Sequence, residues 1–231
     1  MPIIEIVPGV HQLMFAGVNI ALIADEELTL VDTGVPGSLP GILNLIRRLG
    51  RSVEEISTVI ITHNHFDHIG GLPELRKLTD VKVFAHEAAL VGSQAEVPYP
   101  GGIRRLLRVP FMSPIRHRFV LESGDIDVQL AGGEMLRQLG GLQVVHTPGH
   151  TPCSICLYSP ERRLLFVGDA MQRRRRKLQF PARMVSTDMA QAAESVRKLA
   201  GLDFEVLVLG HGRPVTRGAR AWVQALGHTE G

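Results

Sequence analysis

The sequence predicts an α/β fold in which two β-sheets pack face to face with helices on their outer sides. In both halves of the chain, a block of apolar, strand-like segments is followed by amphipathic helices. The 231 residues are 45% hydrophobic, which is enough for a substantial core. Neither an internal repeat nor a linker is evident, so residues 1–231 are expected to form a single domain.

The first half opens with the strand-like segment 3–7. The elements expected after it are strands at 11–15, 18–24 and 28–31, a helix at 36–49, a strand at 59–62, a helix at 69–78, a strand at 81–85 and a short helix at 86–91. In the helix at 36–49, apolar residues recur at three- and four-residue spacing and Gly50 marks the end.

The second half repeats this order with other lengths. Its expected elements are strands at 119–121, 126–130, 142–146, 154–158 and 164–167, a helix at 188–199, a strand at 206–209 and a helix at 215–226. Asp188 is expected to cap the helix that follows it. Between the halves, residues 92–117 combine prolines, glycines and arginines with apolar side chains. A long irregular segment of this kind predicts a partly helical flap inserted over a cleft.

The histidine-rich segment 62–68 predicts a metal site. It reads Thr-His-Asn-His-Phe-Asp-His and follows the apolar run 58–61, so His63, His65, Asp67 and His68 lie where a buried strand ends. Neutral imidazoles and carboxylates are donors that Zn²⁺, Fe²⁺ and Mn²⁺ accept. A polar surface loop that is rich in histidine by chance is the weaker interpretation.

Three further residues share this local context. His150, Asp169 and His211 each follow an apolar strand and neighbour a glycine, which lets the backbone crowd around a common centre. Each residue alone would more often be structural than a ligand. Together with the first motif, they are expected to complete the site.

These motifs, together with Val31-Asp32-Thr33-Gly34, resemble the metallo-β-lactamase superfamily of hydrolases in order from about residue 18 to residue 214. The resemblance implies a four-layer αββα sandwich with the site at one edge between the sheets. It implies that His63, His65 and His150 hold one metal, that Asp67, His68 and His211 hold the other, and that Asp169 bridges them. It also implies that Asp32 accepts a hydrogen bond and orients the ligands.

The expected function is therefore a binuclear metal-dependent hydrolase that uses a metal-bridging hydroxide on an ester, thioester or lactone. Asp67 is the expected proton acceptor. The expected cofactors are two divalent ions, zinc first, with iron or manganese as alternatives. A mononuclear iron enzyme resembling the persulfide dioxygenases and an RNA or phosphodiester hydrolase remain open. The long interval from His68 to His150 disfavours a glutathione thioesterase.

Several other residues are secondary candidates or have a structural explanation. Cys153 and Cys156 have CxxC spacing, but on a strand they would face opposite sides, which predicts two small buried side chains. Cys153 replaces the glycine usual in the family. The basic run 173–177 is expected to be a solvated face or an anion-attracting rim. His86 and Tyr99 are secondary candidates for the cleft, His146 is expected to point away from it, and Ser154 and Ser186 are expected to be structural.

Composition sets the expected partners and location. The net charge is only +2, so a small-molecule substrate, possibly anionic, is expected and nucleic acid is disfavoured. No apolar run approaches the ~20 residues of a membrane span, and no export signal is visible, which also disfavours a β-lactam substrate. Two cysteines are too few for a disulfide framework, so the expected location is the cytoplasm. The oligomeric state cannot be read from the sequence.

Overall fold

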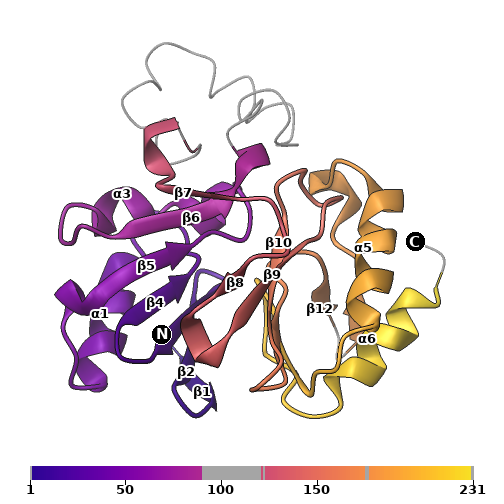
Figure 1. Cartoon of the computed structure of the whole chain (residues 1–231), viewed down its shortest axis with the longest axis horizontal. Helices are drawn as coiled ribbons and strands as arrows, with labels where there is room; N and C mark the ends of the chain where they lie inside the picture. Colours follow the sequence, from indigo (N-terminus) through magenta and orange to yellow (C-terminus); the bar gives the residue numbers. More distant parts are fainter. Residues whose placement is uncertain (1, 90–120, 122, 175–176, 230–231) are drawn as a thin grey trace.

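The computed structural model describes residues 2–89, 121, 123–174 and 177–229. Two sheets lie face to face, with α1 and α3 outside the first sheet and α5 and α6 outside the second (Figure 1). The expected four-layer α/β sandwich is therefore confirmed. The helices are α1 (Leu39–Arg48), α2 (Phe66–Ile69), α3 (Leu72–Leu75), α5 (Met189–Ala200) and α6 (Ala219–Gly227).

The first sheet has seven strands in sequence order, β1-β2-β3-β4-β5-β6-β7. They are β1 (Ile3–Val7), β2 (Val10–Phe15), β3 (Val18–Ala24), β4 (Leu28–Val31), β5 (Ile56–Ile60), β6 (Lys82–His86) and β7 (Val128–Leu130). The strands from β4 to β7 run parallel, so their carboxyl ends lie at the same edge of the sheet.

The second sheet has the order β14-β11-β10-β9-β8. Its strands are β8 (Met135–Leu136), β9 (Leu142–His146), β10 (Ile155–Ser159), β11 (Leu164–Phe166) and β14 (Val206–Val208). A separate hairpin is formed by β12 (Gln172–Arg174) and β13 (Lys177–Gln179).

Three apolar layers hold the sandwich together, one between the sheets and one beneath each pair of outer helices. The side chains of β3 alternate between two of these layers. Ala21 and Ile23 pack into the layer between the sheets, whereas Ile20 and Leu22 pack into the outer layer that includes α1 residues. Successive side chains of a strand point to opposite faces, so one short apolar strand contributes to two layers of the core.

Several expected boundaries are wrong. Of the helix expected at 69–78, only the short helix α3 forms, and a second short helix, α2, precedes it where a turn was expected. At Gly71, between them, the chain passes so close to Thr33 that a Cβ there would lie 2.3 Å from the Thr33 carbonyl oxygen. The last helix begins at Ala219 rather than at 215, since Val215 forms two backbone hydrogen bonds with Leu207. The helix expected from 36 begins at Leu39.

Other differences involve short elements. His86 ends β6, and a 3₁₀ turn at Glu87–Ala89 follows it; the last two residues of the helix expected at 86–91 lie outside the described residues. The strand β8 and the β12–β13 hairpin were not expected, because neither has an apolar run of its own. The flap at 92–117, Tyr99 and most of the strand expected at 119–121 lie outside the described residues.

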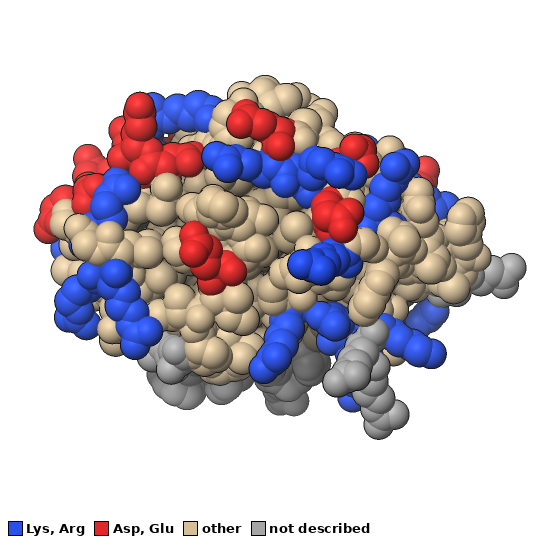
Figure 2. Space-filling model, turned by 90° about the horizontal axis from the view of Figure 1, so that it is seen from below, with Lys and Arg blue, Asp and Glu red and all other residues tan. Residues whose placement is uncertain are grey.

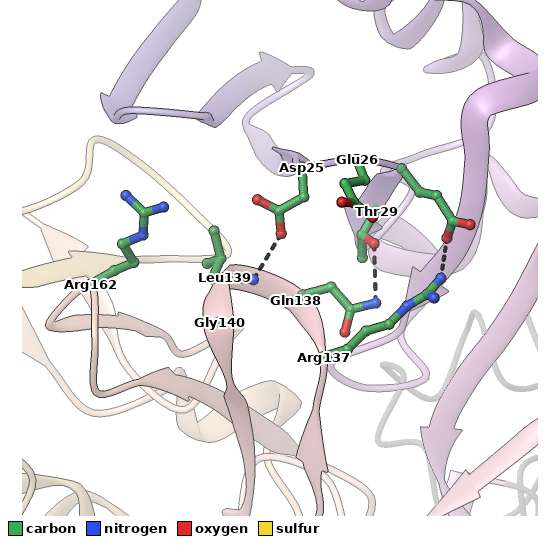
Figure 3. Close-up of a pocket in the computed structure, with 9 residues that line it drawn as sticks. Asp25, Glu26, Thr29, Arg137, Gln138, Leu139, Gly140 and Arg162 are labelled. Atoms are coloured by element: carbon green, nitrogen blue, oxygen red, sulfur yellow. Dashed lines mark hydrogen bonds and ion pairs between the residues drawn. The ribbon is translucent and has the colours of Figure 1, made fainter.

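At the edge where β4 begins, polar contacts join the two sheets around a hollow of about 380 Å³ (Figure 3). Asp25 accepts a hydrogen bond from the backbone N–H of Leu139 at 2.8 Å, and Arg137 pairs with Glu27. Leu139 has a φ of 54°, a left-handed conformation that costs energy for a leucine. These contacts hold the β3–β4 turn against the β8–β9 connection. They lie at the amino end of β4, whereas Asp32 lies at its carboxyl end.

Candidate metal centre

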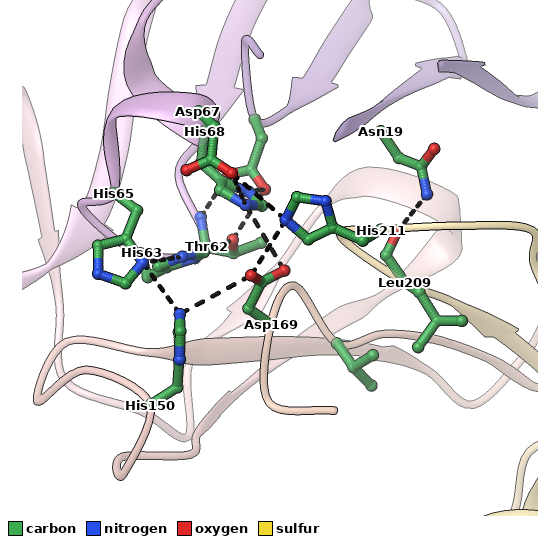
Figure 4. Close-up of polar contacts among 12 residues, drawn as sticks. Asn19, Thr62, His63, His65, Asp67, His68, His150, Asp169, Leu209 and His211 are labelled. Carbon is green, nitrogen blue, oxygen red and sulfur yellow. Dashed lines mark hydrogen bonds and ion pairs between the residues drawn. The ribbon is translucent and has the colours of Figure 1, made fainter. Parts of the chain in front are cut away.

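Three imidazoles form the first group of the site (Figure 4). His63 and His65 follow β5, and His150 lies in the loop after β9. The Nδ1 atom of His65 is 3.1 Å from Nε2 of His63 and 2.9 Å from Nε2 of His150. All three side chains are buried, so three nitrogen atoms meet within a space that one cation would fill.

The second group contains Asp67, His68 and His211. Asp67 and His68 lie on α2, directly after the first motif, whereas His211 follows β14. The Nε2 atom of His211 is 3.3 Å from Oδ2 of Asp67. The short helix α2 turns these two side chains toward the edge of the second sheet, where His211 lies.

Asp169 lies between the two groups (Figure 4). It follows β11, and its carboxylate oxygens lie 3.5 Å from Nε2 of His68, 3.2 Å from Nε2 of His211 and 3.8 Å from Nε2 of His150. Gly210 leaves room for it, because a Cβ at that position would be 2.1 Å from Oδ1 of Asp169. The structure therefore brings together all seven residues that the sequence suggested as ligands.

Each of four imidazoles uses its Nδ1 nitrogen outside the centre. Nδ1 of His68 donates to Asp32 at 2.7 Å, and Nδ1 of His211 donates to the carbonyl of Gly17 at 2.9 Å. Thr62 donates its hydroxyl proton to Asp32 and so accepts from Nδ1 of His63 at 3.1 Å. The corresponding atom of His150 contacts Ser186 at 3.1 Å.

These bonds set the tautomer of each ring. When Nδ1 carries the proton, the Nε2 lone pair of the neutral imidazole points into the centre, as a metal ligand requires. Asp32 also accepts from the backbone N–H of Thr62 at 2.8 Å, so its carboxylate fixes both a ring and the strand end that carries the motif. The hydrogen bond to Asp32 that the resemblance implied is therefore present, and it is made by His68.

The loop that carries His211 is held by a side chain of the first sheet. Asn19 donates to the carbonyl of Leu209 at 2.8 Å and to that of Gly212 at 2.6 Å. Gln12 donates to the same Gly212 carbonyl at 3.1 Å. Because β3 belongs to one sheet and His211 to the other, these bonds fix the distance across the centre.

Protonation differs between the two groups in the metal-free protein. Burial lowers the pKa of His63 well below its ordinary value, and it lowers that of His65 to about 3 and that of His150 to about 4. Burial also opposes charge on His68 and His211. There, however, the neighbouring carboxylates, led by Asp32 for His68 and by Asp169 for His211, raise the pKa to about 9 and about 11 respectively.

The donor set fits divalent cations. Nε2 of His68 and Oδ1 of Asp169 are buried and have no hydrogen-bond partner among the described residues, although they lie 3.5 Å apart. Protons on His68 and His211 balance the carboxylates when no metal is bound, and a cation would replace them. Nitrogen and carboxylate donors in two adjoining groups suit zinc, iron or manganese.

The two groups open into one pocket of about 390 Å³. His65, His150, Asp67, Asp169 and His211 line its polar side. The rest of the lining is largely apolar; its residues are Phe66, Pro181, Ala182 and Val185, here called the apolar wall, together with Gln172. A small organic substrate with an apolar part would therefore contact both the metal centre and this wall.

The other candidate residues have structural contacts. His86 stacks on His146 with ring centroids 3.9 Å apart, and neither ring lines the pocket. Cys153 and Cys156 are free, buried thiols with raised pKa values, the largest cause in each case being burial. They pack in different core layers, as expected, although only Cys156 lies on a strand and Cys153 is in the turn before β10. Ser154 contacts the hydroxyl of Thr151 at 2.8 Å.

The basic run is partly structural. The guanidinium of Arg173 lies 5.1 Å from the centre of the Trp222 ring and donates to the carbonyl of Pro214 at 3.0 Å. Arg174 and Lys177 are exposed on the hairpin. Of the described residues in this run, only Arg174 and Lys177 are therefore free of such structural contacts and could attract an anionic substrate.

No pattern in the sequence indicated Asn19 or Gln12, which hold the His211 loop, and Ser186 was expected only to be structural, without its contact to His150. Asn19 looks like any polar residue on a strand, and Ser186 lies in an irregular segment before α5. Neither has a local pattern that marks it, because each makes its contact with a distant part of the chain.

Comparison with known proteins identifies the family that the sequence motifs resemble. The family model of the metallo-beta-lactamase superfamily matches residues 14–211. A probable metallo-hydrolase of Bacillus subtilis (strain 168), YflN, is 30% identical over 229 residues, which is 92% of this chain and 87% of that protein. The chain belongs to the metallo-β-lactamase superfamily. It is accordingly a metal-binding hydrolase.

Two further relatives carry more specific names. The human acyl-coenzyme A thioesterase MBLAC2 is 30% identical over 172 residues, covering 66% of this chain and 58% of that protein. A hydroxyacylglutathione hydrolase of Albidiferax ferrireducens is 29% identical over 154 residues, covering 65% and 46%. This chain therefore spans only about half the length of these two relatives.

The fold has close counterparts among solved structures. A metallo-beta-lactamase family protein from Thermus thermophilus superimposes with a TM-score of 0.71 at 23% identity, covering 96% of this chain and 79% of that one. Within the described part of this chain, no helix has both the length and the apolar content that crossing a membrane requires.

Proposed function

We propose that this protein is a dinuclear metal-dependent hydrolase of a carboxylic ester, thioester or lactone, with an acyl thioester as the first substrate class to test. The observation that carries the proposal is the position of Asp169, whose two carboxylate oxygens face both groups of ligands within one pocket. One cation in each group would place the pair close enough to share this carboxylate.

The expected metals are two divalent cations, with zinc first and iron or manganese as alternatives. When bound, such a pair supplies a hydroxide near neutral pH and polarises the acyl carbonyl. The chain itself binds and orients the substrate. The apolar wall formed by Phe66, Pro181, Ala182 and Val185 would hold the acyl group and exclude water from it.

Asp67 is the residue placed to move a proton. Its side chain lines the pocket and is 22% exposed, and Oδ2 lies 3.3 Å from Nε2 of His211. The hydrogen bond to His211 lowers the pKa of Asp67 even though burial opposes this. A carboxylate with this contact takes up a proton weakly and returns it easily, which suits transfer to a departing thiolate or alkoxide.

The names of two relatives support a thioester, since one is an acyl-coenzyme A thioesterase and the other a hydroxyacylglutathione hydrolase. The long interval between His68 and His150 still disfavours a glutathione thioester for this chain. Assays on acyl-coenzyme A and on acylglutathione esters of the same acyl group would separate the two. The compartment proposed for the reaction is the cytoplasm, because Cys153 and Cys156 are unbridged thiols.

Two alternatives rank lower. A mononuclear iron enzyme would leave the group of Asp67, His68 and His211 without a use, although its ligand atoms also lie within 4.8 Å of one another. An RNA hydrolase would need a strongly basic surface. On the face shown in Figure 2, Lys and Arg lie interspersed with Asp and Glu, so that face presents no single sign of charge.

The test combines metal content with activity. Elemental analysis of protein purified without added metal or chelator should find about two zinc or manganese ions per chain, and a panel of thioesters, esters and lactones should yield a hydrolysed substrate. About one iron per chain, with oxygen consumption on thiol substrates, would replace the proposal with the mononuclear enzyme. Two bound metals without hydrolysis of any acyl substrate would reject the substrate class.

A variant tests the central residue. Asp169→Ala should lower both metal content and turnover, because it removes the carboxylate that faces both groups. Asp203→Ala is the matched control, since Asp203 is 60% exposed and pairs with Arg163 and Arg220 away from the pocket. Full activity with two metals in the Asp169 variant would remove this residue from the mechanism.

A further inference from the structure

Ser186 joins the apolar wall of the pocket to one of the metal-binding imidazoles. Its Oγ donates to the carbonyl of Ala182 at 2.9 Å and lies 3.1 Å from Nδ1 of His150. A serine hydroxyl has one proton, and here that proton goes to the Ala182 carbonyl. The oxygen must therefore accept from Nδ1–H of His150, which leaves the Nε2 lone pair directed at His65, 2.9 Å away.

The backbone holds Ser186 in this position. The N–H of Thr187 lies 3.1 Å from the carbonyl oxygens of both Gly149 and His150, and the N–H of Asp188 donates to Gly149 at 2.9 Å. A Cβ at Gly149 would lie 2.2 Å from the backbone nitrogen of Ala192 at the start of α5. The His150 loop is thus pressed against the segment that contains Ser186, and neither can shift alone.

The same segment shapes the pocket. Ala182 and Val185 line the apolar wall, and a 3₁₀ turn at Arg183–Val185 connects them directly to Ser186. One hydroxyl therefore contacts both the wall that would hold an acyl group and the ring that would hold a cation. Displacing the wall would break the bond to Ala182, and rotating His150 would break the other.

We propose that Ser186 is a positioning residue that fixes the tautomer and orientation of His150 for a divalent cation. It acts through His150 and does not touch the metal or the reacting atoms. The inference rests on the proposed metal centre but not on the identity of the substrate. Outer contacts of this kind to a metal-binding histidine typically change metal affinity by about 10–100-fold when removed.

The first experiment measures zinc affinity by competition with a chromophoric chelator on the full chain. Ser186→Ala should weaken binding at one of the two sites by about 10–100-fold, and Ser186→Thr, which keeps the hydroxyl, should restore most of it. Thr187→Val is the matched control. Thr187 donates its hydroxyl to Gly149 at 3.0 Å, so this variant removes a bond to the same loop without touching the imidazole.

The second experiment observes the tautomer itself. Proton–nitrogen NMR spectra of the zinc-loaded protein should show an Nδ1–H resonance for His150, and this resonance should be lost or broadened in Ser186→Ala through faster exchange of that proton with water. Thermal unfolding of the metal-free variants verifies that each one folds.

Three results would overturn the inference. These are unchanged zinc affinity in Ser186→Ala, an equal loss in Thr187→Val, and a wild-type protein that binds no zinc. Two of them, unchanged affinity and an equal loss, leave the proposed hydrolase intact. Conversely, a protein that binds two zinc ions through a Ser186-dependent site but cleaves no acyl substrate would reject the proposed reaction and keep the role of Ser186.

Discussion

Oδ2 of Asp32 lies 2.7 Å from Nδ1 of His68, and both side chains are buried. Asp32 reaches this position from the end of β4, with a φ of 62° that few residues other than glycine, asparagine and aspartate adopt. It also accepts two hydrogen bonds from Thr62, at the end of the neighbouring β5. A single carboxylate therefore sets the orientation of a candidate ligand and the ends of two parallel strands.

Replacing this carboxylate should weaken metal binding more than folding. Asp32→Asn keeps the shape and the backbone conformation but offers His68 a neutral acceptor, so metal affinity should fall by about 10–100-fold. Chelator competition and elemental analysis measure this. Asp25→Asn is the control, since Asp25 accepts from Leu139 at the opposite end of β4. Equal metal content in the two variants would contradict the role of Asp32.

The space that Gly210 provides should be required for the centre. In Gly210→Ala, the new Cβ would lie 2.1 Å from Oδ1 of Asp169, and the carboxylate must move away from both ligand groups. We expect metal content and activity to fall together. Gly201→Ala is the matched control, because its Cβ would meet only a carbonyl oxygen at 3.4 Å. If both variants kept two metals, the proposed crowding at Asp169 would be wrong.

The bonds from Asn19 should stabilise the loop of His211. Asn19→Ala leaves the buried carbonyl of Leu209 and that of Gly212 without this donor, at a cost of about 1–3 kcal/mol in the free energy of unfolding. Metal affinity should also fall, because His211 loses its fixed distance from Asp67. Asn44→Ala on α1 is the matched control. Asn44 is partly exposed, and among the described residues its side chain forms a hydrogen bond only with Arg47. Denaturant titrations with and without zinc compare the two.

The metal-free protein should be most stable near pH 6.5. Below this pH, His65 and His150 become protonated in the unfolded chain, whereas in the folded protein burial lowers their pKa values to about 3 and about 4. The unfolded state therefore binds more protons, and the free energy of unfolding falls as the pH drops. Above it, the stabilisation from His68 and His211 is lost as the pH rises toward their folded pKa values of about 9 and about 11.

Denaturant titrations at pH 5, 6.5 and 8.5 would reveal this maximum. Asp32→Asn should flatten the fall above pH 6.5, since Asp32 is the carboxylate that contributes most to the raised pKa of His68. Saturating zinc should change the whole profile, because bound metal replaces the protons. Stability that rises steadily through pH 8.5 without metal would contradict the assignment of protons to His68 and His211.

Many strands and helices could be predicted from their own residues alone. Apolar strands such as β3 and β10 have enough length and contrast with their flanking turns to be recognised alone. The hairpin β12–β13 and the short strand β8 lack this contrast, so nothing in their own residues indicated pairing. The early end of the helix expected at 69–78 and the break at Gly71 were not predicted, because the close approach of Thr33 to Gly71 is a contact between distant segments.

The sequence by itself determined which side chains are candidate ligands, because they lie within a few residues of the end of an apolar strand, in segments that the local pattern identifies as turns. It also indicated Asp32, through the short motif that resembles the family. Only the tertiary structure decided how these residues are held. Ser186 is 36 residues from His150, and Asn19 is 190 residues from Leu209. A hydrogen bond between such partners depends on how two sheets and a helix pack, and local periodicity carries no record of that packing.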